Sequence, residues 1–363
     1  MAVHLGQRGP GHQARVGGVP ASEEDTTPEA FTLGQVAWAP LAALCESEAM
    51  TVLGTSAPAA ISITGGEYAV NGGGWTSVGG MVEPGDTVRV RRYAAATVAT
   101  SLDAELTIGG VSDAFTVTTV ANAEASTLVL RFSVEAAEAR RGLIDDCVGA
   151  LKAAGVWEKL DAFYMLAAHD AQAARCNWVQ DAFNLTAVNG PAFEADLGYT
   201  GVPGTQGHLD TGFNDLTGSA LWSQDSLCAG VYVNLAPSQS NSLLGLVGAV
   251  SLRLGASLTH ITTRIHSGSS FNPVFAEATP AHIAITRDGA TSSRCVRNGV
   301  QVGSTSSAAS TTSSDSNVTL FRSTSAYNGD RIACAHLGGA LTVAEVASLQ
   351  AAIHTYLTAL GAA

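Results

Sequence analysis

The ten residues "RCVRNGVQVG", Arg294–Gly303, carry the sharpest structural signal in this chain of 363 residues. Asn298 and Gly299 stand between two strand-like flanks, and this dipeptide favours the two-residue type I′ turn of a β-hairpin. Just upstream, "HIAITRDG", His282–Gly289, has the alternation of a strand, and we expect its final Asp-Gly pair to close it. Together these segments predict antiparallel β-structure in the second half of the chain.

A second β pattern fills residues 27–120. In "TVRVR", Thr87–Arg91, two valines alternate with two arginines, the period of two expected of a strand with one buried face. "EPGD", Glu83–Asp86, has the proline and glycine of a tight turn. Short strands at this spacing predict a small antiparallel sandwich.

Two segments have helical periodicity instead. In "EARRGLIDDCVGALKAAGVWEKL", Glu138–Leu160, apolar residues recur at intervals of three and four, which predicts an amphipathic helix ending near Gly155. The chain closes with "LTVAEVASLQAAIHTYLTALG", Leu341–Gly361, where Thr342 and Glu345 form a capping box and the last glycine stops the helix.

These changes of period divide the chain into four predicted parts, and the fold class is mainly β. An N-terminal anchoring arm takes residues 1–26, and the first sandwich takes 27–120. After a break at "ANAEAST", a linker and helical segment takes 121–176, and a long β domain takes 177–363.

Composition narrows the classes of function. Charged residues make up 13% of the chain, the net charge is −13, and the only lysines are Lys152 and Lys159, so we expect no nucleic-acid partner. No apolar run reaches the roughly 18 residues of a membrane helix, so we expect no membrane insertion. The first twenty residues lack the apolar core of a secretory signal, so the chain is expected to be made in the cytoplasm, or exported or released by another route.

The six cysteines are scattered and contain no CxxC pair. We interpret them mainly as small buried apolar residues, with disulfides left open, because a zinc site requires closely spaced pairs. No other cofactor is expected. A structural calcium ion is an alternative because hard cations prefer loop carboxylates, and its candidate ligands are Asp210, Asp215 and Asp330.

Catalytic motifs are missing from the sequence. None of the nine histidines has the context of a metalloprotease helix, and there is neither a GxSxG elbow nor a GxxxxGK loop. Paired carboxylates are the remaining enzymatic option, because glycoside hydrolysis needs two acids about 5 to 10 Å apart. The acids that could supply them are Glu194, Asp196, Asp210, Asp215 and Asp225, although acids in loops are more often solvated.

Several aromatic residues stand beside glycine, asparagine, aspartate or serine in predicted loops. An aromatic face next to hydrogen-bonding groups can stack on a sugar ring, although roofing of the nearby core is the more common role. The candidate carbohydrate-binding residues are Tyr199, Phe213, Asp215, Trp222, Phe271 and Tyr327.

Two families are similar to parts of this chain. The segments "ISITGGEYAVNGGGW", "VEPGDTVRVR" and "LTIGGVSDAFTVTT" resemble an immunoglobulin-like module found in virion proteins of tailed bacteriophages and in bacterial surface proteins. From about Arg140 onward, "GHLDTGFND", "AHIAITRDG", "VRNGVQVGS" and "GGALTVAEVASLQ" resemble the concanavalin A-like (LamG-like) jelly rolls of phage structural and receptor-binding proteins.

The resemblance implies two facing antiparallel sheets that bind carbohydrate. The glucanase branch of that superfamily carries an ExDxE strand motif, which this chain lacks, so the resemblance implies binding without hydrolysis and a protein that is not an enzyme.

The leading hypothesis is a virion structural protein of a phage or gene transfer agent, a head or tail spike or fibre component at the virion surface, made in the bacterial cytoplasm. Its N-terminal region would attach to capsid, portal-proximal or tail proteins, and its jelly roll would bind host surface polysaccharide, as a homo-oligomer. The alternatives are a polysaccharide-degrading glycoside hydrolase of the virion and a purely architectural capsid decoration protein.

Overall fold

The structure, a computed structural model, describes residues 24–235, 241–246, 252–256, 261–273, 280–324 and 326–363. All but the last three residues of the predicted anchoring arm, 1–26, lie outside the described residues. Contacts divide the described chain into two units. The first holds residues 24–34, 46–91 and 104–115, and the second holds residues 35–45, 92–103 and 116–363.

The predicted β-sandwich at 27–120 is built from two sheets. The first contains, in spatial order, β1 (Gln35–Ala39), β9 (Val111–Thr119), β8 (Ser101–Ile108), β4 (Ala59–Thr64) and β6 (Gly80–Val82). The second contains β2 (Leu44–Glu46), β7 (Thr87–Tyr93) and β3 (Met50–Thr51), with β5 (Glu67–Val70) also paired to β7. Val88 and Val90 on β7 are fully buried while Arg89 is exposed, which confirms the predicted alternation.

The second unit contains two larger sheets. The eight-stranded sheet contains β12 (Ala192–Glu194), β13 (Gly198–Thr200), β25 (Arg331–Gly338), β15 (Leu227–Val233), β19 (Ala281–Gly289), β20 (Ser292–Arg297) and β21 (Val300–Ser306), with β10 (Leu160–Met165) paired to β25. The six-stranded sheet contains β11 (Thr186–Val188), β14 (His208–Asn214), β22 (Asn317–Leu320), β16 (Asn241–Leu246), β17 (Leu252–Ala256) and β18 (Ile261–Ile265). A small pair, β23 (Arg322–Ser323) and β24 (Ala326–Tyr327), follows β22.

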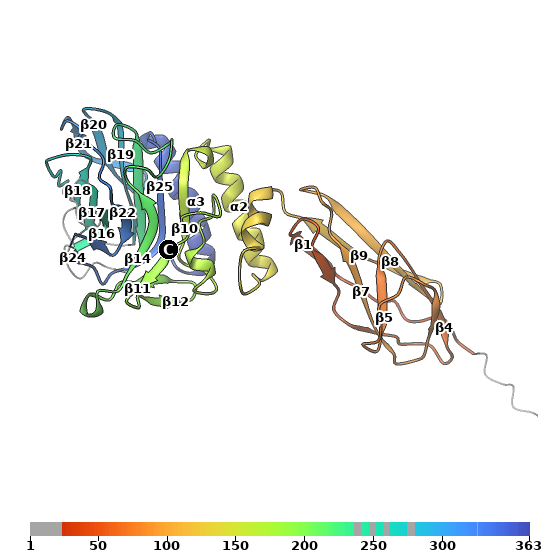
Figure 1. The fold of residues 1–363 in the computed structure, drawn as a ribbon. Helices are drawn as coiled ribbons and strands as arrows, with labels where there is room; N and C mark the ends of the chain where they lie inside the picture. The colour runs from red at the N-terminus through yellow and green to blue at the C-terminus, as the bar shows by residue number, and fades with distance from the viewer. Residues whose placement is uncertain (1–23, 236–240, 247–251, 257–260, 274–279, 325) are drawn as a thin grey trace, which may run out of the picture. The chain divides into compact units, whose positions relative to one another are not determined.

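Helices form a further layer of this unit. The helices are α1 (Ala123–Val129), α2 (Glu138–Ala153) and α3 (Val343–Leu360), and the 3-10 turns are η1 (Trp157–Lys159), η2 (Ala173–Arg175) and η3 (Pro203–Thr205). Figure 1 shows α2 and α3 beside the eight-stranded sheet, on the side away from the six-stranded sheet.

The eight-stranded sheet is therefore covered on both faces. On β15, Val231 and Val233 pack into the core between the sheets, while Cys228 and Tyr232 pack into the core under the helices. This explains why β15 is buried along its whole length. The fold class predicted from the sequence is confirmed in that the described chain is mainly β, with a β-sandwich followed by two larger facing sheets and a C-terminal helix.

The turn at Asn298 and Gly299, which predicted the β-hairpin, has the expected conformation. Asn298 and Gly299 have φ of 49° and 78°, the positive values that a type I′ turn requires, and they join β20 to β21. The turn before β20 lies later than predicted. Strand β19 continues through Asp288 and Gly289, and residues 290–291 make the reversal because β19 and β20 stay paired up to Gly289 and Ser292.

The predicted start of α3 and the predicted ends of α2 and α3 are confirmed. The hydroxyl of Thr342 accepts a hydrogen bond from the Glu345 backbone N–H, and the Glu345 carboxylate accepts one from the Thr342 N–H. Gly361 ends α3 with φ of 72°, and Gly155 follows α2 with φ of 64°. These positive values favour glycine because they would strain a residue with a Cβ atom.

The segment 121–176, predicted as linker and helix, contains two elements that its sequence did not reveal. The expected break at 121–127 overlaps α1, whose start is held by the buried carboxylate of Asp145. That carboxylate accepts hydrogen bonds of 2.8 Å from the backbone N–H groups of Ala121 and Asn122. Strand β10 is fully buried and pairs with β25, so the eight-stranded sheet includes residues before 177.

All six cysteines are free thiols, and only Cys45 is not buried. Within the described ranges, no helix is both long enough and apolar enough to cross a membrane.

Candidate functional site

Four of the six predicted carbohydrate-binding residues lie in the core of the second unit. Tyr199, Phe213, Asp215 and Trp222 are at most 4% exposed. Tyr199 belongs to β13 and Phe213 to β14, so these rings belong to strands and pack between the two sheets. None of the three rings presents a face on which a sugar could stack, which corrects the expectation that they lie in exposed loops.

Asp215 is the centre of a buried hydrogen-bonding cluster. Its Oδ1 lies 2.5 Å from His266 Nε2 and accepts a hydrogen bond of 3.0 Å from Trp222 Nε1. Its Oδ2 accepts one of 2.6 Å from the Ser314 backbone N–H. A carboxylate paired with a histidine can act in acid–base catalysis, but these two side chains are both 0% exposed. The cluster therefore fixes three loops to one another.

The candidate calcium ligands are not brought together. Asp210 accepts a hydrogen bond from Asn317, Asp330 one from Asn328, and Asp215 belongs to the buried cluster. In the part of the chain that the structure describes, no group of three histidine, cysteine or acidic residues is arranged to hold a metal ion.

Phe271 and Tyr327 are the predicted candidates that remain at the surface, both half-buried. The guanidinium carbon of Arg322 lies 5.4 Å from the centre of the Tyr327 ring, and the His208 ring centre lies 5.8 Å from it. The Tyr327 hydroxyl donates a long hydrogen bond of 3.5 Å to Gln206. We call this group of four residues the tyrosine cluster.

A polar hollow that the sequence analysis did not anticipate lies elsewhere on the second unit. It has a volume of about 440 Å³, within the range of small-molecule sites. We call it the arginine pocket, and its lining residues are Arg131, Gln172, Arg175, Cys176, Asp181, Asn184 and Leu185.

One wall of the arginine pocket is built around Gln172. Its side-chain carbonyl accepts a hydrogen bond of 2.9 Å from the Ser133 backbone N–H. Its side-chain amide donates to the backbone carbonyl of Arg131 at 3.0 Å and to the sulfur of Cys176 at 3.3 Å. Gln172 thus ties the end of α1 to η2, and its hydrogen-bonding groups are used within the protein.

A second wall is an ion pair that holds the loop after η2. Arg131 donates to Asp181 Oδ1 at 3.1 Å, and Asn184 Nδ2 donates to the same oxygen at 3.0 Å. These hydrogen bonds, with that of Asn184 the larger effect and that of Arg131 next, hold the pKa of Asp181 below its usual range. The other carboxylate oxygen, Oδ2, has no partner among the described residues, and the side chain is 71% exposed.

Arg175 is the lining residue with unused hydrogen-bonding capacity. Its Nε donates to the Ala171 carbonyl at 3.0 Å, and its backbone carbonyl accepts from the Leu185 N–H at 2.8 Å. The described chain offers no partner to its two terminal nitrogens, and no acid forms an ion pair with it. The arginine pocket therefore combines free N–H donors from Arg175 with a free acceptor on Asp181, the two groups needed to bind a polyhydroxylated molecule.

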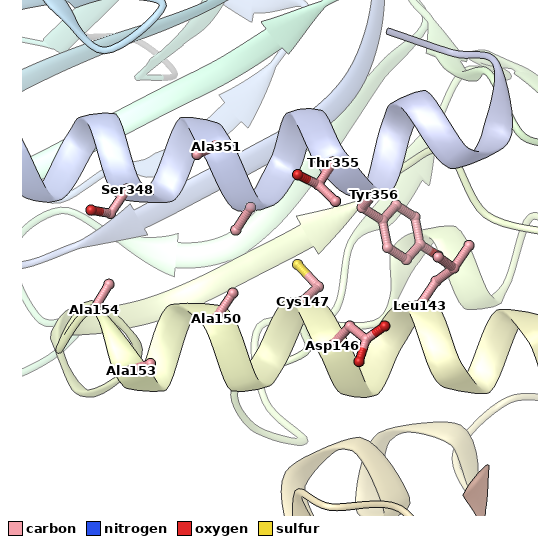
Figure 2. Close-up of a pocket in the computed structure, with 11 residues that line it drawn as sticks. Leu143, Asp146, Cys147, Ala150, Ala153, Ala154, Ser348, Ala351, Thr355 and Tyr356 are labelled. Atoms are coloured by element: carbon pink, nitrogen blue, oxygen red, sulfur yellow. The ribbon is translucent and has the colours of Figure 1, made fainter. Parts of the chain in front are cut away.

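Another hollow, of about 480 Å³, is the groove between α2 and α3. Figure 2 shows the small side chains of Cys147 and Ala150 on α2 pointing toward α3, where Ser348 lines the groove. Alanine methyl groups cannot satisfy sugar hydroxyls, so this groove is the weaker candidate for a carbohydrate site.

Comparisons with known proteins give only distant likenesses. No family model and no curated protein matches the chain. Domain 4 of AbnA, an extracellular arabinanase from Geobacillus stearothermophilus solved with arabinotriose, is 14% identical with a TM-score of 0.39, covering 53% of this chain and 98% of that one. The binding domain of Paraclostridial Mosquitocidal Protein 1 is 11% identical with a TM-score of 0.36, covering 53% and 52%.

A Trypanosoma rangeli sialidase mutant with trans-sialidase activity is 12% identical with a TM-score of 0.42, covering 73% of this chain and 46% of that one. This chain thus spans about half the length of the mosquitocidal binding domain and of the sialidase. The names of these neighbours describe binding domains and glycan-processing enzymes, and at these identities and TM-scores they assign no activity to this chain.

Proposed function

We propose that this chain is a glycan-binding structural protein of a phage-type virion. It attaches to other virion proteins through its N-terminal region and presents its second unit to a polysaccharide of the host cell surface. It binds the polysaccharide without cleaving it. The observation that carries the binding role is the arginine pocket, where the free donors of Arg175 and the free acceptor of Asp181 line one preformed hollow.

The arrangement suits a sugar because neighbouring hydroxyl groups both donate and accept hydrogen bonds. A carboxylate oxygen accepts from one hydroxyl while a guanidinium donates to another, and charged partners make such bonds stronger than neutral ones. The Gln172, Arg131 and Asn184 contacts hold the walls in place before a ligand arrives, so little conformational entropy is lost on binding.

Binding is tested by titrating the full chain with oligosaccharides released from candidate host polysaccharides, using isothermal calorimetry. Arg175→Gln is expected to weaken binding about tenfold to a hundredfold, the effect of losing a charge-assisted hydrogen bond. Arg322→Gln is the matched control, because Arg322 also has no acidic partner among the described residues but belongs to the tyrosine cluster. A loss confined to Arg322→Gln would place the site at the tyrosine cluster instead.

The alternatives give different outcomes in the same experiment. Release of reducing ends during the titration would indicate a hydrolase, while no binding to any host glycan would favour an architectural protein.

The virion role rests on the sequence resemblance of both β regions. It is tested by cryo-electron microscopy of particles carrying either the full chain or a chain that lacks residues 1–26. We expect density for the protein only with the full chain. Equal incorporation of the truncated chain would exclude the N-terminal region as the anchor.

A further inference from the structure

We infer that the arginine pocket selects an acidic sugar, a uronic acid whose carboxylate is bound by Arg175. This inference rests on the proposed glycan-binding role and names the chemical class of the ligand. An arginine uses up to five N–H groups, and Arg175 spends one of them, Nε–H, on the carbonyl of Ala171. The remaining four lie on its two terminal nitrogens, and a guanidinium edge matches the two oxygens of a carboxylate.

The charges of the lining support an anionic ligand. Among the lining residues, Arg131 pairs with Asp181 at 3.1 Å, and Arg175 forms no ion pair within the described chain. The nearby Asp170, which is not a lining residue, is directed to other groups. Its Oδ1 accepts from the Gln172 backbone N–H at 2.7 Å, and its Oδ2 lies 3.3 Å from His169 Nε2. Asp170 makes no ion pair with Arg175 in the described chain.

The same lining orients the sugar. Asp181 remains ionised at neutral pH and would repel a carboxylate placed beside it, while its free Oδ2 accepts from hydroxyl groups. A uronic acid therefore has a single favourable orientation, with its carboxylate at Arg175 and its hydroxyls toward Asp181. The Arg131–Asp181 pair also lines a smaller hollow of about 210 Å³, which provides room for a neighbouring residue of the polymer.

The chemistry is tested with matched oligosaccharides. Trisaccharides of galacturonic, glucuronic and mannuronic acid are each compared with their carboxyl-reduced, neutral products and with a sulfated neutral trisaccharide, by calorimetry on the full chain. We expect at least one uronate to bind about tenfold or more tightly than its reduced product. Arg175→Gln should lower the affinity for that uronate by a larger factor than it lowers the affinity for the reduced, neutral product, because the neutral sugar loses only a hydroxyl contact.

Arg175→Lys separates charge from shape. It keeps the positive charge but loses the planar fork, so we expect an affinity between those of the wild type and Arg175→Gln. Thermal melting of each variant checks that the fold is intact.

The outcomes separate this inference from the function on which it rests. If acidic and reduced sugars bind equally well, or if the sulfated sugar binds more tightly than every uronate, selection of a carboxylate is overturned while glycan binding stands. If no sugar in the panel or in host polysaccharide binds, the glycan-binding function itself fails.

Discussion

Acidification to pH 5.5 is expected to destabilise the second unit by about 3 kcal/mol through two buried histidines. His282 on β19 and His336 on β25 are fully buried, and their Nε2 atoms lie 3.0 Å apart. Neither Nδ1 has a hydrogen-bond partner in the part of the chain that the structure describes. Burial lowers the pKa of His282 to about 4. Burial, and then the neighbouring His282, lowers the pKa of His336 well below its ordinary value.

The magnitude follows from linkage between proton binding and folding. In the unfolded chain both histidines have a pKa near 6.5, so at pH 5.5 each binds a proton that the folded pair excludes. Each difference of one pH unit costs about 1.4 kcal/mol, or about 3 kcal/mol for two. Because the folded pKa values are the lower ones, this stability is fully present above about pH 6.5 and is lost as the pH falls toward the folded values.

Urea unfolding at pH 7.5 and pH 5.5, followed by tryptophan fluorescence, measures this difference. Trp157, Trp178 and Trp222 are buried in the second unit and report on it. His282→Gln should reduce the pH-dependent loss to about 1.4 kcal/mol, since one titrating group remains. Each protein is compared with itself at the two pH values, so the cost of the substitution at pH 7.5 cancels.

His354→Gln is the control because His354 is exposed on α3, and it should retain the full loss of the wild type. If His282→Gln loses as much stability on acidification as the wild type does, the buried histidine pair is not the source of the pH dependence.

Three further predictions concern single positions. Thr342→Ala removes the N-terminal cap of α3 and should lower the unfolding free energy by about 1 kcal/mol in urea titrations; an unchanged midpoint would contradict the cap's role. Gly230→Ala places a Cβ 2.3 Å from His336 Nε2, and this clash should lower the unfolding free energy by about 1 to 3 kcal/mol in the same assay. A wild-type midpoint would show that β15 and β25 can move apart to accommodate the methyl group. Only Cys45 is not buried, so a thiol reagent should modify one cysteine rapidly in the native chain and all six in urea; Cys45→Ser should abolish the rapid phase.

Local signals in the sequence predicted the features that depend on a few neighbouring residues. The hairpin at Asn298 and Gly299 and the capping box of Thr342 and Glu345 each depend on residues at most three positions apart. Helix α1 was missed because its start is held by Asp145, more than twenty residues later. A pattern of period or propensity contains no information about such a partner.

The arginine pocket could not be predicted for the same reason. Arg131 and Asp181 are 50 residues apart in sequence, and the pocket exists because the end of α1 lies against the loop after η2. The one available signal was the density of polar residues in "RCNWVQDAFN", Arg175–Asn184, inside an otherwise apolar region. The prediction that Phe213 and Trp222 bind sugar was wrong because small polar neighbours are as common in tight turns as in exposed loops. The rings of Phe213 and Trp222 lie in the core beneath such turns.

A chain of net charge −13 can still bind an acidic ligand, because the net charge and Arg175 act on the ligand over different distances. The surface charges act on an approaching polymer over a Debye length, about 8 Å at physiological ionic strength, so they affect mainly the rate of association. Arg175 acts at hydrogen-bonding distance, inside a hollow where solvent screens it less, so it affects mainly the rate of dissociation. Net repulsion at long range and the guanidinium of Arg175 at short range therefore give slow association and selective retention, and a neutral polymer gains less from Arg175 than a uronate does.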